Sequence, residues 1–350
     1  MMDTLRSIKS LRLSEYHDNK GFDQILMQIF GLPRSGKSSF INSCEFALDV
    51  SKFKKYAKPG HSKRGKSAVR RSHQLTDSIW MVNNPGLRAI HAFHDGEIFA
   101  QLGDFLPRDE ELEWSECKET LYRQHDRLND KDRLKILFCE FIVPVFVHSI
   151  SNPISEEEIP LYKELLDTTR KMTGMNPFVV LTHKNHKGKN SMTNIFKGMG
   201  IKKIFTVENY AVKNHQPVRE KHEEMLHFFI EVINEVKLSL KDRITPKDER
   251  DERLRFVVKY INRSDEQKTE EEQERRMREQ QKKKMHEEIK KRHNDQKKNT
   301  PKEIGKASEP KNGIKEHKNV SETSFLSSHW LMVFIIAVLA VFYIVVTKSN

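Results

Sequence analysis

One short segment of the chain holds the residue types that bind phosphate. Residues 31–38 are Gly-Leu-Pro-Arg-Ser-Gly-Lys-Ser and match the pattern GxxxxGK[ST]. Glycines let backbone N–H groups close around phosphate oxygens, and the N-terminus of a following helix adds partial positive charge. In such a loop Lys37 reaches the β- and γ-phosphates and the hydroxyl of Ser38 ligates Mg²⁺. The residues expected at the nucleotide are Gly31, Arg34, Ser35, Gly36, Lys37, Ser38 and Ser39.

A second candidate segment follows the apolar residues 78–82. Asn83-Asn84-Pro85-Gly86-Leu87 resembles the switch II motif Asp-Thr-Pro-Gly-Leu of GTPases, with Asn in place of Asp. Asn83 can accept a hydrogen bond from a Mg²⁺-bound water but contributes no charge, so we expect weaker Mg²⁺ binding and slower turnover. Leu87 stands where Ras-type proteins orient water with Gln. Asn83 and Gly86 are therefore nucleotide-site candidates, and an ordinary Asn-Pro-Gly turn is the alternative.

Two later segments are candidates for contact with the base. Thr182-His183-Lys184-Asn185 resembles the guanine-specificity motif in its T-H-x-D form. The Asp of that motif accepts hydrogen bonds from guanine N1–H and from the exocyclic amine, whereas Asn185 has a single acceptor oxygen. Preference for guanine over adenine is therefore left open. Asn209 follows the apolar residues 203–207 and is expected in the loop beside the base.

Arg34 is the candidate catalytic residue. Its position makes the phosphate loop similar to the arginine-bearing loop of guanylate-binding proteins and atlastins, in which this Arg acts as an internal arginine finger. The chain lacks the Arg-Asp base motif of that group, so the similarity is local. A solvent-facing or phosphate-balancing arginine is the alternative.

A strongly basic segment lies between the phosphate loop and the second apolar run. Residues 52–71 contain nine Lys and Arg and no acidic residue. Switch I of a GTPase belongs here, and Ser67 is expected to substitute for the Thr that ligates Mg²⁺. The segment could bind anionic lipid headgroups or phosphate-rich partners. A solvated loop that only nucleotide orders is the alternative.

Alternating strands and helices must position these segments. Apolar, β-prone runs predict strands, and amphipathic runs between them predict helices. The expected strands are 24–30, 78–82, 141–148, 178–181 and 203–207, and the expected helices are 39–50, 156–172 and 218–238. This alternation predicts an α/β domain with a central, mostly parallel sheet over residues 20–240, preceded by an N-terminal segment over residues 1–19.

The C-terminal third of the chain differs in composition. Residues 241–329 are too polar to bury a core, and residues 241–298 among them are expected to form a charged helical stalk. From Asp265 to Lys298 many Glu residues stand four positions before Lys or Arg, which predicts a solvated helix, with weak coiled-coil pairing as the alternative. Residues 299–329 contain Pro and Gly and predict a flexible spacer. Residues 330–346 (WLMVFIIAVLAVFYIVV) carry no charge. They predict a transmembrane tail anchor, with a buried core helix as the alternative.

The length of this apolar run favours the endoplasmic reticulum, which has a thin membrane, with the mitochondrial or peroxisomal outer membrane as alternatives. The N-terminus lacks the apolar core of a secretory signal, and the three cysteines form no CxxC pair, so the domain is expected in the cytosol with reduced thiols. The net charge of +12 would suit anionic partners. No zinc-finger or RNP-type motif accompanies it, so nucleic acid is not an expected partner.

The order of these motifs resembles a known family. GLPRSGKSSFINS, NNPGL, VVLTHKN and FTVENYA, over residues 24–236, are similar to the G domain of the interferon-induced protein 44 family and, more distantly, of the immunity-associated and chloroplast-import-receptor GTPases. The resemblance implies a Ras-like P-loop G domain. The residues it places at the phosphates are Gly31, Gly36, Lys37 and Ser38, and those it places near the base are Thr182, His183, Asn185 and Asn209.

The expected function is that of a membrane-anchored GTP-binding switch with slow hydrolysis. Its cofactors would be GTP or GDP and Mg²⁺, and its output would be recruitment of a partner or formation of a G-domain homodimer. A pseudo-GTPase scaffold with little or no hydrolysis is the alternative that Asn83, Asn185 and Leu87 favour. A P-loop ATPase or kinase is a third hypothesis, because Asn185 replaces the Asp that makes the motif specific for guanine.

Overall fold

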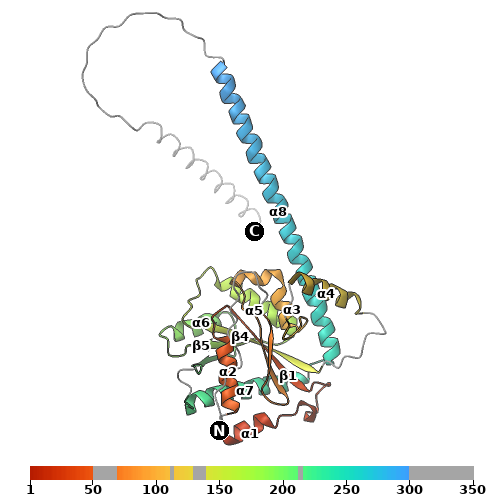
Figure 1. Ribbon diagram of the computed structural model, residues 1–350, viewed down its shortest axis with the longest axis vertical. Helices are drawn as coiled ribbons and strands as arrows, with labels where there is room; N and C mark the ends of the chain where they lie inside the picture. Colours follow the sequence, from red (N-terminus) through yellow and green to blue (C-terminus); the bar gives the residue numbers. More distant parts are fainter. Residues whose placement is uncertain (50–68, 111–113, 129–138, 212–215, 299–350) are drawn as a thin grey trace, which may run out of the picture. The chain divides into compact units, whose positions relative to one another are not determined.

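The computed structural model describes residues 1–49, 69–110, 114–128, 139–211 and 216–298. Ser67, residues 52–68 of the basic segment, the spacer and the candidate anchor at 330–346 lie outside this part of the chain. The chain divides into two compact units, Met1–Gln281 and Lys282–Asn350. The first unit contains the sheet and all of the described candidate site residues (Figure 1).

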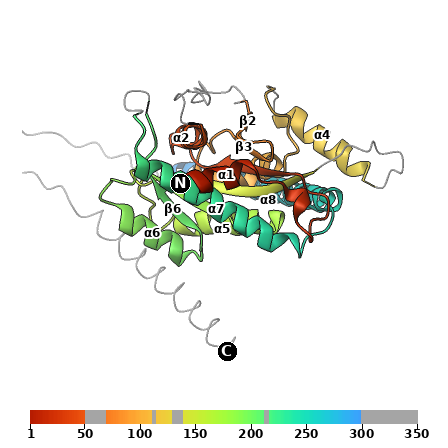
Figure 2. The ribbon, with the colours of Figure 1, turned by 90° about the horizontal axis from the view of Figure 1, so that it is seen from below.

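Six strands form one sheet in the order β2-β3-β1-β4-β5-β6 (Figures 1 and 2). The strands are β1 Gln24–Phe30, β2 Arg71–Gln74, β3 Ile79–Asn83, β4 Glu140–Ser149, β5 Phe178–Thr182 and β6 Ile204–Val207. Every neighbouring pair is parallel except β2 and β3, which are antiparallel. The predicted α/β domain with a mostly parallel sheet is therefore confirmed.

The central strands are continuous apolar runs because helices cover both faces of the sheet. Residues 25–30 of β1 and 141–149 of β4 are buried throughout, as expected for parallel strands between two helical layers. Pro144 is unfavourable inside a central strand because it lacks an N–H. It lies opposite Gln28 of β1, and pairing of β4 with β5 begins only at Val145.

The helices divide between the two faces of the sheet. Their bounds are α1 Met2–Lys9, α2 Lys37–Leu48, α3 Glu97–Leu102, α4 Trp114–Asp126, α5 Ile159–Thr173, α6 Lys189–Gly198, α7 Arg219–Leu240 and α8 Pro246–Lys298, with short 3₁₀ turns at Leu13–Glu15 and Ile90–Asp95. Helices α1, α2 and α7 bury their apolar side chains in one cluster. The other cluster contains side chains of α3, α4, α5, α6 and the first part of α8.

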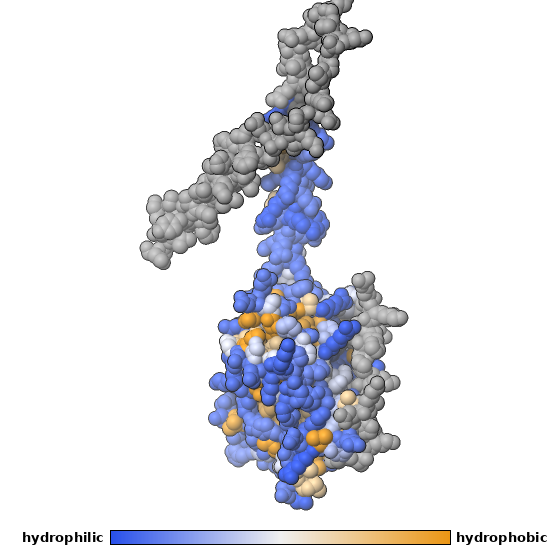
Figure 3. Space-filling model, turned by 90° about the vertical axis from the view of Figure 1, so that its left-hand side faces the viewer, coloured by the Kyte–Doolittle hydropathy of each residue, from blue (hydrophilic) through white to orange (hydrophobic). Residues whose placement is uncertain are grey.

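Helix α8 corrects the prediction that residues 241–329 are too polar to bury a core. Leu254, Val257, Val258 and Ile261 are buried in the second cluster. Their i, i+3, i+4, i+7 spacing places them in one apolar stripe, which packs against the domain. The average composition of the segment does not reveal the stripe, because most of the surrounding residues are charged. Further along, Met277 is exposed. Figure 3 shows the described surface of the later part of α8 as almost entirely hydrophilic.

No helix of the described residues is long and apolar enough to cross a membrane. The anchor prediction falls on residues 330–346, which are outside that part of the chain, and it stays a prediction. The sequence did not predict β2, which begins at Arg71 inside the supposed switch I segment, or the helices between β3 and β4.

Candidate phosphate and base site

The loop between β1 and α2 has the backbone conformation that its glycines allow. Gly31 has φ of 138° and Gly36 has φ of 92°, and both values favour glycine. A Cβ on Gly31 would lie 2.2 Å from the carbonyl oxygen of Val147, so no side chain fits there. The predicted order of strand, loop and helix is confirmed, with α2 starting at Lys37, two residues earlier than expected.

Lys37 points back into the loop that precedes it. Its Nζ donates hydrogen bonds to the carbonyl oxygens of Gly31 (3.1 Å) and Leu32 (2.9 Å). An ammonium group has three donors, so one more can bind an anion. Burial of the ammonium group lowers the pKa of Lys37 to about 8. A phosphate group beside it would favour the charged form, because an opposite charge offsets the cost of burial.

Asn83 lies beside Ser38 at the start of α2. The side-chain amide of Asn83 donates a hydrogen bond to Ser38 Oγ over 2.9 Å. The contact arises because β3 pairs with β1 in parallel, with Asn83 opposite Ile29. Among the described residues no group of three His, Cys, Asp or Glu could hold a metal ion. Ser38 and Asn83 offer only neutral oxygens, so phosphate oxygens would have to supply the anionic ligands for Mg²⁺.

The turn after Asn83 lies directly on the phosphate loop. The backbone N–H of Leu87 donates to the carbonyl oxygen of Gly31 over 3.2 Å. A Cβ on Gly86 would lie 2.9 Å from the backbone nitrogen of Pro33 and 3.2 Å from Lys37 Nζ. Leu87 itself is buried, so its side chain is not placed to orient a water molecule.

The two candidate base segments contact the loop from the other side. Thr182 Oγ1 donates to the carbonyl oxygen of Ser35 over 2.8 Å, and Asn209 Nδ2 donates to that of Gly36 over 3.4 Å. Two buried polar atoms here have no hydrogen-bond partner among the described residues, the hydroxyl of Ser35 and Oδ1 of Asn209. Because buried polar atoms are normally satisfied, these two atoms fit a site that binds a polar ligand.

Glu208, in the expected base loop, contacts the other candidate base segment, and the sequence predicted no role for its side chain. Its carboxylate accepts a hydrogen bond from the backbone N–H of Asn185 over 3.4 Å, so a negative charge stands beside the residue that lacks one. Asn185 is exposed, and so is His183, whose φ is 62° and whose Nδ1 lies 2.9 Å from Ser149 Oγ. The sequence did contain an indication of this role, because Asn185 lacks the carboxylate of the guanine motif and Glu208 is an acidic residue in the other candidate base segment.

Arg34 and Ser39 lie at the edge of this arrangement. Both side chains are exposed, and Arg34 has a φ of 61°. The structure therefore brings Gly31, Ser35, Gly36, Lys37, Ser38, Asn83, Gly86, Thr182 and Asn209 into mutual contact around one loop. Arg34 and Ser39 belong to the same segment, but their side chains are exposed and do not pack against these residues.

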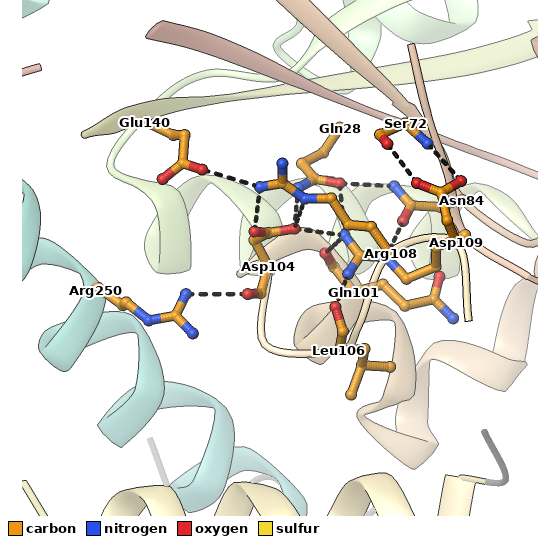
Figure 4. Close-up of polar contacts among 11 residues, drawn as sticks. Gln28, Ser72, Asn84, Gln101, Asp104, Leu106, Arg108, Asp109, Glu140 and Arg250 are labelled. Atoms are coloured by element: carbon orange, nitrogen blue, oxygen red, sulfur yellow. Dashed lines mark hydrogen bonds and ion pairs between the residues drawn. The ribbon is translucent and has the colours of Figure 1, made fainter. Parts of the chain in front are cut away.

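A second polar cluster surrounds Arg70, at the end of the basic segment. Its guanidinium donates to Asn84 Oδ1 (2.8 Å), to the carbonyl oxygen of Gln101 (2.9 Å) and to Asp104 Oδ1 (2.9 Å). The contacts of Gln28, which also accepts from Arg70, and of Leu106 are drawn in Figure 4. Arg70 is only 3% exposed. It is therefore not available to lipid, which corrects that part of the prediction for residues 52–71.

Asp104 balances the positive charge of Arg70 in this cluster. Arg108 forms a second ion pair with it and also bonds Glu140 Oε1 over 3.2 Å (Figure 4). Burial alone would raise the pKa of Asp104, but the hydrogen bonds and charges of Arg108 and Arg70 outweigh it and hold the value at about 2. Asp104 is therefore ionised at neutral pH, and the buried guanidinium is paired.

Comparison with known proteins adds no further assignment. No protein-family model matches the chain, and no curated protein aligns with it significantly.

Proposed function

We propose that the chain binds a guanine nucleotide with Mg²⁺ at the loop 31–38 and acts as a membrane-anchored, nucleotide-controlled switch with slow GTP hydrolysis. The observation that carries this proposal is the way the loop is enclosed. The turn at Gly86 lies against it on one side, and Thr182 and Asn209 lie against it on the other. A Ras-like G domain with a C-terminal stalk is the fold that this arrangement favours.

The phosphates would lie within the loop. Backbone N–H groups at the start of α2, the hydroxyl of Ser35 and the free donor of Lys37 would bind their oxygens. Ser38 would ligate Mg²⁺, which would neutralise charge on the β- and γ-phosphates. Asn83 would contact this ion only through a water molecule and without charge, so its contribution would be weak.

The base would lie between His183 and the Asn209 loop. Glu208 would supply the carboxylate that reads guanine, since it lies within hydrogen-bond distance of the Asn185 backbone. A carboxylate accepts from N1–H and from the exocyclic amine of guanine, and adenine offers no donor at N1. Preference for guanine would therefore persist although residue 185 is Asn.

Hydrolysis would be slow for two reasons. Asn83 carries no charge, and the side chain of Leu87 is buried where a water-orienting residue would be needed. Arg34 would act as an internal arginine finger, because it is exposed on the loop next to the phosphates.

Residues 330–346 would anchor the chain in an intracellular membrane, with the endoplasmic reticulum favoured and the G domain in the cytosol. The output would be recruitment of a partner or formation of a G-domain homodimer. The competing proposal is a membrane-tethered scaffold that has kept the fold and lost turnover, and the three residues Asn83, Leu87 and Asn185 favour it.

A nucleotide titration tests the proposal. The full-length chain in detergent is titrated with fluorescent GTP, GDP and ATP analogues, with and without Mg²⁺, beside the Lys37→Ala variant. Guanine-selective binding that Lys37→Ala abolishes would support the switch. Binding without selectivity would favour an ATPase, and absence of binding to the folded protein would favour the scaffold.

A further inference from the structure

We propose that nucleotide bound at the loop 31–38 is energetically coupled to the docking of residues 250–264 of α8. The proposal rests on the nucleotide site proposed above. It adds that the first part of α8 changes its docking on the domain when nucleotide binds. Two independent sets of contacts connect the two places, and both begin at the turn that follows Asn83.

The first set of contacts is polar and passes through Arg70. Asn84 is 2% exposed and immediately follows Asn83, the residue bonded to Ser38. Its side-chain oxygen accepts from Arg70 Nε over 2.8 Å, and its amide donates to Gln28 Oε1 over 3.0 Å. A backbone shift at Asn83 that carries Asn84 with it would therefore strain or break a buried hydrogen bond of Arg70.

Arg70 in turn holds the segment that contacts α8. It pairs with Asp104, whose φ is 59°. The backbone oxygen of Asp104 accepts a hydrogen bond from Arg250 of α8 over 3.0 Å, as Figure 4 shows. The guanidinium of Arg250 also lies 4.8 Å from the ring centre of Phe105. The end of the polar path is therefore a two-point contact on the first part of α8.

The second set of contacts is apolar. Leu87 and Ile90 belong to the same buried cluster as Leu254 and Ile261 of α8. A Cβ on Gly96 would lie 2.6 Å from Ile261 Cγ1, so the helix touches the backbone of this segment.

A hydrogen bond fixes the position of the helix along this segment. Ser264 Oγ of α8 donates to the carbonyl oxygen of His94 over 2.5 Å. The chain that follows the switch II-like turn is thus the surface on which α8 lies.

These contacts would act as a two-state element. Close-packed surfaces shift between discrete arrangements and do not deform continuously. Nucleotide that orders Asn83 and Gly86 favours one arrangement of the turn, and α8 docks on residues whose positions follow from it. Coupling of this kind is reciprocal: the factor by which nucleotide changes the docking equilibrium is also the factor by which docking of α8 changes nucleotide affinity, so a variant that releases α8 must change that affinity.

The test uses the full-length chain in detergent and has two readouts. Hydrogen–deuterium exchange of backbone amides 250–264 is followed without nucleotide, with GDP, and with a non-hydrolysable GTP analogue and Mg²⁺. Affinity for both nucleotides is then measured in Arg250→Met and in Arg255→Met. Arg255 is exposed on the same helix and serves as the matched control.

The expected result is a change of about fivefold or more in exchange between the two nucleotide states, a size typical of allosteric coupling. Arg250→Met should change the GTP-to-GDP affinity ratio by a similar factor, and Arg255→Met should leave it unaltered. Nucleotide binding with unchanged exchange and an unchanged ratio would overturn the coupling and leave the nucleotide site intact. Absence of nucleotide binding would overturn both.

Discussion

The side-chain amide of Asn83 donates its hydrogen bond to the hydroxyl oxygen of Ser38 over 2.9 Å. A carboxylate in the same place could only accept, so the hydroxyl would have to donate to it. The difference matters for Mg²⁺, which binds the lone pairs of hydroxyl oxygens. The hydrogen bond from Asn83 uses one of the two lone pairs of Ser38 Oγ, so it would compete with Mg²⁺ for this oxygen.

Asn83→Asp should therefore strengthen Mg²⁺ binding. The carboxylate accepts from Ser38, frees the oxygen lone pair and adds negative charge, and we expect about tenfold tighter Mg²⁺ and faster GTP hydrolysis. A Mg²⁺ titration of nucleotide binding and a phosphate-release assay measure the two effects. Asn83→Ala serves as the control, because it removes the hydrogen bond without adding charge. The same Mg²⁺ dependence in all three proteins would contradict this role.

Lys37 should make nucleotide affinity depend on pH. Its pKa in the free protein is about 8, below the ordinary value of 10.5, because the ammonium group is buried. Bound phosphate favours the charged form, so the complex has the higher pKa and binding takes up a proton above pH 8. Affinity should therefore be independent of this group below about pH 8 and fall by up to about tenfold per pH unit above it. Binding is titrated from about pH 7 to about pH 10.

The matched control for this pH dependence is Lys37→Met, which keeps the length of the side chain and removes the charge. Its residual binding should be weak and should lack the decline above about pH 8. A decline of equal slope in this variant would assign the effect to another group.

Arg34 should affect turnover more than binding. The side chain is exposed and the residue has a φ of 61°, which strains Arg and Ala alike, so Arg34→Ala removes the charge and leaves the backbone strain in place. Arg34→Asn removes the charge and relieves the strain, because Asn tolerates positive φ, so agreement between the two variants assigns the effect to the charge. We expect kcat to fall by at least about tenfold in both variants with nearly unchanged nucleotide affinity. Single-turnover hydrolysis measures kcat, and an unaltered value in Arg34→Asn would exclude the arginine finger.

The part of the site that sequence could predict is the part set by local spacing. The strand at Gln24–Phe30 and the loop 31–38 are contiguous, so their geometry follows from residue types a few positions apart. Asn83, Thr182 and Asn209 could also be placed near the loop. Each lies at or just after the carboxyl end of a parallel strand, and the carboxyl ends of parallel strands meet at one edge of a sheet.

Contacts between distant segments could not be predicted in this way. The partners of Arg70 come from β1, from the turn after β3 and from the segment after α3, and no short spacing indicates them. The many basic residues of the segment 52–71 favoured a solvated loop. The side chain of Arg70 is nevertheless buried. The apolar stripe at 254–261 has the spacing of a buried helix face, but the many charged residues around its four side chains made the whole segment look solvent-exposed.

Gly86→Ala should weaken nucleotide binding with little effect on the fold. The added methyl would lie 2.9 Å from Pro33 N and 3.2 Å from Lys37 Nζ, so the turn must withdraw from the loop or displace the ammonium group. We expect affinity to fall by at least about tenfold, which corresponds to about 1.4 kcal/mol. Gly198→Ala is the control, because a Cβ there meets nothing within 4 Å. Circular dichroism checks the fold, and wild-type affinity in Gly86→Ala would contradict the close contact.

Glu208 should decide which base is bound. Its carboxylate lies beside the Asn185 backbone and would be the acceptor for the N–H groups of guanine in the proposed site. Glu208→Gln replaces one acceptor oxygen by a donor, which faces the N–H groups of guanine. GTP affinity should therefore fall by about tenfold or more, while ATP affinity stays the same or rises. Glu157→Gln, an exposed change of the same kind, should alter neither.

A second variant separates recognition of the base from support of the loop. Asn185→Asp introduced into Glu208→Gln restores a carboxylate a few ångströms away, and it should recover the preference for GTP over ATP. If Glu208 only held the loop in place, Glu208→Gln would weaken GTP and ATP binding by equal factors, and Asn185→Asp would restore neither. The ratio of the two affinities therefore distinguishes the roles, because a general loss of structure cancels in the ratio and a lost contact to guanine does not.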